Sequence, residues 1–300
     1  MIWWDKSWNP ILGCTKCSPA CDNCYAERTH TQRHRAKLAG VDMPLCYAKP
    51  FGEVSWFADR LEQPLHWRKP QRIFVGNMTD IFHPDVKQNW LNLIFHVMAH
   101  SPQHTFMLCT KRPDRMEQYI NGVINSGMTW REGLTGRPLP NVWIGTTIWD
   151  QPSADERIPI LLRTPAAKHY VSYEPALGPV DGRKYMRPRQ QFFNAIADVC
   201  ANILGEPVPS VDAGEPGLDW VICGGENGPG ARPMHPDWPR SLRDQCQAAG
   251  VPFFFKQWGE WAENGRPSDT WDDELMMYRV GSRRAGRVLD GRTWEEVPTC

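Results

Sequence analysis

The stretch RIFVG at residues 72–76 is a short, mostly apolar run that ends in glycine. A run of this length between turn residues predicts a buried β-strand. Five more runs of this kind follow along the chain, at residues 105–109, 142–145, 169–173, 220–223 and 251–255. Strands that are apolar along their whole length are typical of a parallel sheet covered on both faces.

Segments with helical features separate these strands. A helix is expected from Tyr25 past His34, another near Asp85, and a third over Leu242–Ala249, where Gly250 ends it. Strands that alternate with helices predict βα units. We therefore expect an α/β fold, a partial (β/α) barrel with parallel strands, and a doubly wound open sheet is the alternative.

The domain organisation follows from the absence of a composition break between the predicted strands. Residues 1–260 are expected to form the barrel. Residues 178–218 contain Pro- and Gly-rich segments around an apolar piece, which predicts an insertion between strands. Residues 261–300 are polar and contain tryptophan, and we expect them to form a tail that packs on the barrel.

Composition excludes several classes of protein. The chain has 300 residues, 41% of them hydrophobic, and a formal net charge of zero, so it is not a broadly basic nucleic-acid-coating protein. It has no run of about 18 apolar residues, so no transmembrane helix and no membrane partner are expected. The N-terminus lacks the layout of a signal peptide, which predicts a cytoplasmic location.

Cysteines are crowded near the N-terminus. The chain has ten, and Cys14, Cys17, Cys21 and Cys24 lie within eleven residues. Crowded cysteines in a cytoplasmic chain more often bind metal than form disulfides. A structural zinc site usually takes two pairs separated by a dozen or more residues, whereas closely spaced cysteines suit an iron–sulfur cluster. The sequence therefore predicts an N-terminal cluster-binding loop, with zinc as the alternative.

The spacing Cys17-x3-Cys21-x2-Cys24 resembles that of the radical S-adenosylmethionine superfamily. The resemblance implies a [4Fe–4S] cluster held by three cysteines, with the fourth iron open to the amino and carboxylate groups of S-adenosylmethionine. It also implies a reductase or flavodoxin-type electron donor. An electron from the cluster cleaves the sulfonium to give a 5′-deoxyadenosyl radical, while the protein positions the cofactor and excludes water.

A wider set of motifs resembles a narrower family. The motifs are WNP at 8–10, GC at 13–14, CDNCYAE at 21–27, MTDIFH at 78–83, TKRP at 110–113, EP at 174–175, GGE at 224–226 and FKQWG at 255–259. Together they resemble the phage gene-product 37/68 family, which is similar to a radical S-adenosylmethionine branch. That family's pattern keeps the cysteines matching Cys14, Cys21 and Cys24. The third ligand is thus Cys14 by the family pattern and Cys17 by the superfamily spacing.

Polar or glycine residues follow the predicted strands, and the carboxyl ends of parallel strands form the active-site face of such folds. The candidate cofactor-binding residues are Asn77, Thr79, Asp80, Glu174, Gly224, Gly225 and Glu226. The first three would hold the amino group of the cofactor, or cap a helix. Glu174 would hydrogen-bond a ribose, or lie on the surface. The two glycines would let a ligand approach the backbone with Glu226 facing it, or form a plain turn.

Other residues at the strand ends are candidates for the reaction itself. Lys111, Arg112 and Lys256 would bind a carboxylate or phosphate of the substrate, or be surface charges. Cys223 and Tyr173 are candidate hydrogen-atom relays, with core packing as the alternative. Cys223, Tyr173 and Lys256 are therefore the candidate catalytic residues.

The predicted function is a radical reaction on a nucleotide or on DNA in a phage, hence in the host cytoplasm. From the family resemblance we expect isomerisation of a glycyl-thymidine adduct during DNA hypermodification, which protects phage DNA from restriction. A radical lyase or DNA-repair enzyme is one alternative. A zinc-binding nucleic-acid module without catalysis is another.

Overall fold

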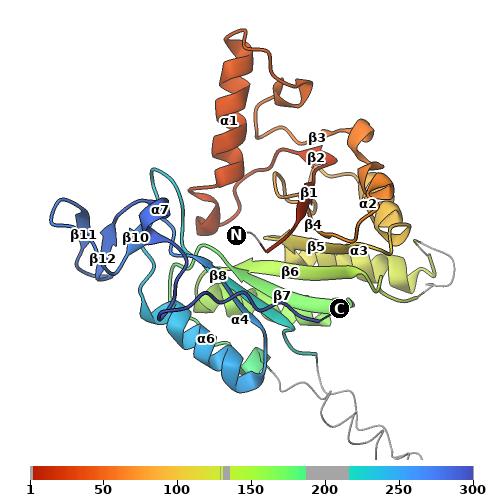
Figure 1. The fold of residues 1–300 in the computed structure, drawn as a ribbon. Coiled ribbons are helices and arrows are strands. Elements are labelled where there is room, and N and C mark those ends of the chain that lie inside the picture. The colour runs from red at the N-terminus through yellow and green to blue at the C-terminus, as the bar shows by residue number, and fades with distance from the viewer. Residues whose placement is uncertain (1–2, 129, 131–135, 187–215, 300) are drawn as a thin grey trace, which may run out of the picture.

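The computed structural model describes residues 3–128, 130, 136–186 and 216–299 (Figure 1). Its centre is a seven-stranded parallel sheet in the order β1-β4-β5-β6-β7-β8-β9. The strands are β1 Lys6–Trp8, β4 Arg72–Val75, β5 Thr105–Thr110, β6 Val142–Ile148, β7 Lys168–Tyr173, β8 Trp220–Gly224 and β9 Phe253–Gln257. Neighbours follow chain order, without the reversal that defines a doubly wound sheet. The fold is therefore α/β with a curled half-barrel sheet, which confirms the predicted partial barrel with parallel strands.

Strand β1 is the one member of this sheet that the sequence does not predict. It has three residues, and among them Trp8 alone is buried. Its pairing with Ile73–Val75 of β4 makes it an edge strand. A polar, three-residue segment has too little periodicity to be recognised as a strand. Strand β2 (Ile11–Leu12), which follows it, pairs with β3 (Ser55–Trp56).

Helices cover the outer face of the sheet (Figure 1). They are α2 Gln88–Ala99, α3 Pro113–Asn125, α4 Gln151–Arg163 and α6 Asp237–Ala249. Helix α2 begins three residues after the predicted start at Asp85, and Asp85 lies instead in a turn in which the Val86 N–H donates to the His83 carbonyl at 2.9 Å. Helix α6 ends as predicted, with Gly250 in the left-handed region at φ +67°.

Alternate residues of the strands pack on opposite faces. In β5, Phe106 and Leu108 join the core beneath the helices, whereas Met107 faces the concave side. In β8, Val221 packs outward, and Trp220 packs on the concave side. Both faces are buried, which explains why the strands read as continuous apolar runs.

Large aromatic rings fill the concave side of the half-barrel. Trp3 lies edge-on to Trp220 and Tyr170, with ring centroids 5.7 and 5.8 Å apart. The Tyr170 ring crosses Gly145 of β6, and its hydroxyl donates to the Leu108 carbonyl of β5 at 2.8 Å. The N-terminal segment is therefore part of the core.

Two further regions complete the described chain. Helix α1 (Tyr25–Leu38) begins at the predicted position and stands away from the sheet (Figure 1). At the other end, β10 (Trp261–Ala262), β11 (Thr270–Asp272) and β12 (Met277–Arg279) form a small antiparallel sheet beside α7 (Ser282–Ala285). Most of the predicted insertion at 178–218 lies outside the described residues. No helix among the residues described is long and apolar enough to span a membrane.

Gly145→Ala should destabilise the half-barrel. A Cβ at this position would lie 2.6 Å from the Tyr170 ring, which cannot move without losing its hydrogen bond. Overpacking of this kind costs about 1–3 kcal/mol. Gly122→Ala is the matched control, because no atom apart from its chain neighbours and the backbone of α3 itself lies within 4 Å of that Cβ. Urea unfolding measures the free energy of unfolding of both variants. If Gly145→Ala were as stable as Gly122→Ala, the predicted overpacking against Tyr170 would be wrong.

Candidate functional site

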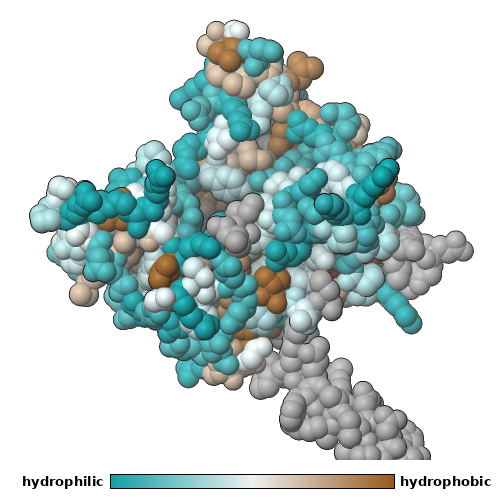
Figure 2. All heavy atoms as spheres, viewed as in Figure 1, coloured by the Kyte–Doolittle hydropathy of each residue, from teal (hydrophilic) through white to brown (hydrophobic). Residues whose placement is uncertain are grey.

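A cavity of about 490 Å³ opens at the carboxyl ends of the strands. Its walls come from the loop that carries the cysteines, from residues following β4 and β5, and from the ends of β7, β8 and β9. Figure 2 shows the surface hollowed between the region of α1 and the C-terminal strands. Its volume is in the range of about 300–1,000 Å³ typical of small-molecule sites. The cavity lies at the face where parallel βα folds place their active sites.

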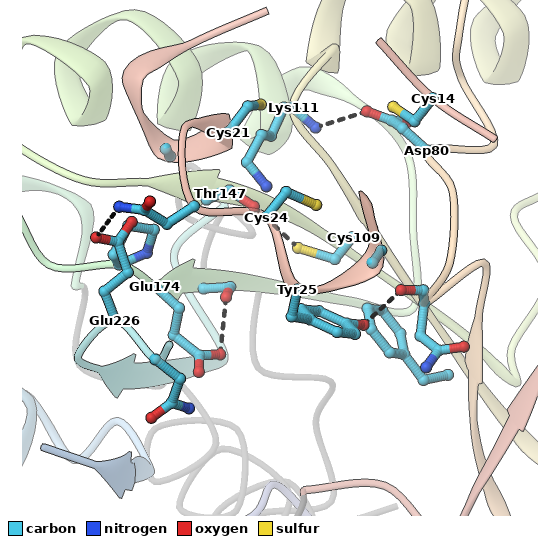
Figure 3. Close-up of a pocket in the computed structure, with 18 of the residues that line it drawn as sticks. Cys14, Cys21, Cys24, Tyr25, Asp80, Cys109, Lys111, Thr147, Glu174 and Glu226 are labelled. Carbon is cyan, nitrogen blue, oxygen red and sulfur yellow. Dashed lines mark hydrogen bonds between the residues drawn. The ribbon is translucent and has the colours of Figure 1, made fainter. Parts of the chain in front are cut away.

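The cysteine loop, residues 13–24, connects β2 to α1 across these strand ends. Cys14, Cys21 and Cys24 line the cavity, and Figure 3 shows their side chains. Cys17 is exposed and is not part of the cavity wall. Cys14 thus shares the cavity with Cys21 and Cys24, whereas Cys17 contacts the Cys21 thiol from outside the cavity wall.

Two cysteines have opposite protonation preferences. A hydrogen bond from Cys17 lowers the pKa of Cys21 to about 4, whereas the same contact raises the pKa of Cys17. The contact thus favours the thiolate form of Cys21 over that of Cys17, and the thiolate is the form that binds metal. Lys111 lies beside it. Burial would lower the pKa of Lys111, but the charges of Cys21, Cys109 and Cys24 outweigh burial and raise it.

Arg112 attaches the first half of the cysteine loop to the sheet. Its guanidinium donates to the Thr15 carbonyl at 2.9 Å and lies 3.7 Å from Sγ of Cys14. It also forms an ion pair with Asp80 at 3.0 Å, and both side chains are largely buried. Burial and the Asp80 carboxylate raise the pKa of Cys14, and Arg112 offsets only part of this effect.

Asp80 organises the ends of β4 and β5. Its carboxylate accepts four hydrogen bonds, from the Thr110 hydroxyl, the Phe82 N–H, the Lys111 N–H and the Arg112 guanidinium, at 2.7–3.0 Å. A carboxylate has about four acceptor positions, so Asp80 has little capacity left for a ligand. Its contacts make it a support for Arg112.

Thr79 and Asn77 also contact neighbouring loop residues. The Thr79 hydroxyl donates to the Gly13 carbonyl, and the Asn77 carbonyl accepts from the Tyr25 hydroxyl. The Asn77 side-chain oxygen accepts from Asn9 at 2.7 Å. Its Nδ2 has no partner among the described residues, and Asn77 lines the cavity. Of the predicted trio, Asn77 therefore has a donor available for a ligand.

Glu226 attaches the second half of the cysteine loop. This buried carboxylate accepts from Asn23 at 2.8 Å and from the Arg232 guanidinium at 2.7 and 3.0 Å. Arg232 in turn donates to the Pro19 carbonyl at 2.9 Å and pairs with Asp22 at 3.3 Å. Burial would raise the pKa of Glu226, but these hydrogen bonds outweigh it and lower the pKa.

The opposite wall of the cavity carries a second charge pair. Lys256 at the end of β9 lies 2.8 Å from Glu174, which also accepts from Ser172 at 3.0 Å. Gly224 leaves room for this carboxylate, because a Cβ there would lie 3.0 Å from Oε1 of Glu174. Gly225 is required by chain packing, because its Cβ would lie 2.0 Å from the Trp258 carbonyl oxygen.

Cys223 and Tyr173 lie away from the cavity. Both are fully buried in the core beneath the helices, and the Tyr173 hydroxyl donates to the Gly178 carbonyl. A relay role for them stays a prediction, without support from their placement. Cys109 lines the cavity instead, with Sγ 3.6 Å from the Thr147 hydroxyl, and burial raises its pKa to about 11. Strand alternation indicates this position, because Cys109 has the same parity as Met107.

A single metal ion and an iron–sulfur cluster require different arrangements of side chains. Among the described residues, no three His, Cys, Asp or Glu side chains converge on one point as ligands of a single ion. In an iron–sulfur cluster each thiolate binds a different iron, so the sulfur atoms surround a larger volume. Cys14, Cys21 and Cys24 all line the same cavity.

Comparison with known proteins gives a family without an assigned activity. A family model described as "Protein of unknown function (DUF5131)" matches residues 1–298. The chain therefore belongs to the DUF5131 family. No curated protein and no solved structure matches it.

Glu226→Gln should loosen the cysteine loop and destabilise the fold. Leaving Arg232 and Asn23 imperfectly paired costs about 1–3 kcal/mol at neutral pH. The folded-state pKa of Glu226 is lowered from 4.5, so its stabilisation is full above that pH and is lost as the pH falls through the folded value. The gap in unfolding free energy between wild type and variant should therefore narrow below about pH 4.5.

The control for this experiment is Glu156→Gln, which changes an exposed carboxylate on α4. Urea unfolding at several pH values measures all three proteins. A stability gap for Glu226→Gln that does not change with pH would show that the carboxylate charge does not hold the loop.

Proposed function

We propose that this protein is a radical S-adenosylmethionine enzyme with one [4Fe–4S] cluster. In this proposal Cys14, Cys21 and Cys24 each bind one iron, and the fourth iron binds the cofactor. Cys17 takes no part in binding. The remainder of the cavity holds the cofactor and the substrate.

One observation carries the proposal, namely that three cysteines of one loop line the same cavity at the carboxyl ends of a parallel half-barrel. Enzymes with parallel βα folds carry out their chemistry at this face. Cysteines with only a packing role, or on the open surface, are not expected to line one ligand-sized cavity together.

The charges around the thiols favour an anionic cluster. Arg112 is 3.7 Å from Sγ of Cys14, and Lys111 lies beside Cys21. Cys24 is the residue that precedes the first turn of α1, where free N–H groups and the helix dipole stabilise negative charge. Cys21 and Cys24 therefore each have a positive group or dipole nearby, whereas Cys14 has both Arg112 and the Asp80 carboxylate close to it.

S-adenosylmethionine would supply the radical chemistry, and residues of this chain would hold it. The free Nδ2 of Asn77 can donate to its carboxylate. Glu174 accepts from Ser172 and Lys256 and retains acceptor capacity for a hydroxyl group. The aromatic rings of Trp3, Trp4 and Phe74 form an apolar part of the cavity wall that limits access of water.

The substrate is proposed from the family resemblance. Isomerisation of a glycyl-thymidine adduct in DNA is the first candidate, and a radical lyase reaction on DNA is the alternative. Mass spectrometry of nucleosides after incubation of the loaded enzyme with adduct-bearing DNA separates them, because isomerisation leaves the mass unchanged and lysis does not.

Cysteine variants test the cluster. Cys14→Ala, Cys21→Ala and Cys24→Ala should each lower iron affinity by at least about 10–100-fold, since even the loss of a ligand's partner has that effect. Cys17→Ala removes a hydrogen bond to Cys21 but no ligand, so it should lower iron affinity less than the three ligand variants do. Anaerobic reconstitution followed by iron and sulfide analysis measures binding, and 5′-deoxyadenosine formed with S-adenosylmethionine and dithionite measures the reaction.

Cys46→Ala is the control, because Cys46 is buried and does not line the cavity. Colourless wild-type protein that binds zinc would refute the proposal and favour the zinc module. Loss of iron in Cys17→Ala, with retention in Cys14→Ala, would replace Cys14 by Cys17 as the third ligand.

A further inference from the structure

Lys111 places an ammonium group among the cysteines. It follows β5 directly, and its side chain runs between Cys21 and Cys24 in the cavity wall (Figure 3). Its backbone is fixed by the N–H bond to Asp80 at 3.0 Å. Within the described chain, the ammonium forms neither a hydrogen bond nor an ion pair. The charge is thus held in a defined place without a compensating carboxylate.

The other half-buried cations of the cavity differ in this respect. Arg112 is paired with Asp80 at 3.0 Å, and Lys256 is paired with Glu174 at 2.8 Å. The field of a paired charge is largely cancelled at a distance. An unpaired charge away from bulk water acts strongly on its neighbours, because the surroundings screen it poorly.

We infer that Lys111 is a positioning residue that raises the reduction potential of the bound cluster. The inference rests on the proposed function. Uptake of one electron from the reductant makes the cluster more negative, and no proton is needed. A fixed positive charge stabilises this reduced state more than the oxidised one, and cluster potentials depend on nearby charge. Lys111 thereby allows a milder one-electron donor to reduce the cluster.

A role in substrate binding is the competing explanation. An ammonium in a cavity also suits a carboxylate or phosphate of the substrate. The two roles can be told apart by experiment. The reduction potential of the cluster measured without substrate depends on Lys111 only if Lys111 acts on the cluster.

Wild type, Lys111→Met and Lys111→Arg should be reconstituted anaerobically and titrated with mediators, with the reduced cluster measured by electron paramagnetic resonance. Methionine keeps about the length of the side chain and removes a charge that forms no ion pair with a carboxylate, so the fold is not expected to suffer. At a given potential the reduced-to-oxidised ratio should fall at least tenfold in Lys111→Met, a shift of about 59 mV to more negative potential. Lys111→Arg should stay close to wild type.

Each result decides between the explanations. An unchanged potential in Lys111→Met at full iron content overturns the inference and leaves the proposed function intact. A raised KM with an unchanged potential assigns Lys111 to the substrate and also overturns it. If the wild type takes up no iron, the proposed function fails and the inference fails with it.

Discussion

The cysteine loop faces the cavity because charge pairs attach it to the sheet at both halves. Arg112, held by Asp80, fixes the segment around Cys14. Glu226, through Arg232 and Asn23, fixes the segment that precedes Cys24. Largely buried charge pairs of this kind contribute less to net stability than to defining one conformation, but breaking them is costly. The position of every candidate ligand depends on these two attachments.

The half-barrel supplies the rigid base for both attachments. Its strands are packed on the outer face by helices and on the concave face by aromatic rings such as Trp3, Tyr170 and Trp220. Residues at the ends of such strands have little freedom, so Asp80 and Glu226 can hold partners that are far away in the sequence. The cavity exists where this aromatic packing stops and the cysteine loop crosses above it.

The sheet could be predicted because its strands are apolar throughout, and the three-residue β1 could not because it carries too little pattern. The site was predicted less completely. The sequence identifies Asp80 and Glu226 as polar residues after predicted strands. It does not tell whether their carboxylates bind a ligand or hold the cysteine loop in place. That choice depends on Arg112 and Arg232, whose positions follow from the folded chain. Cys223 and Cys109 are a second case in which the sequence alone did not identify the cavity residue. Alternate residues of a strand face opposite sides of the sheet, and this alternation places Cys109, not Cys223, at the cavity.

The last residues of the described chain affect how the molecule meets its surroundings. Residues 294–296 run antiparallel along β9 and exchange backbone hydrogen bonds with Phe253 and Phe255. The opposite border of the sheet, β1, is three residues long. An open sheet normally presents rows of unpaired N–H and C=O groups that invite aggregation. Here residues 294–296 cover the β9 edge, and the β1 edge is too short to pair with a strand of another molecule. The open half-barrel therefore avoids edge-to-edge association.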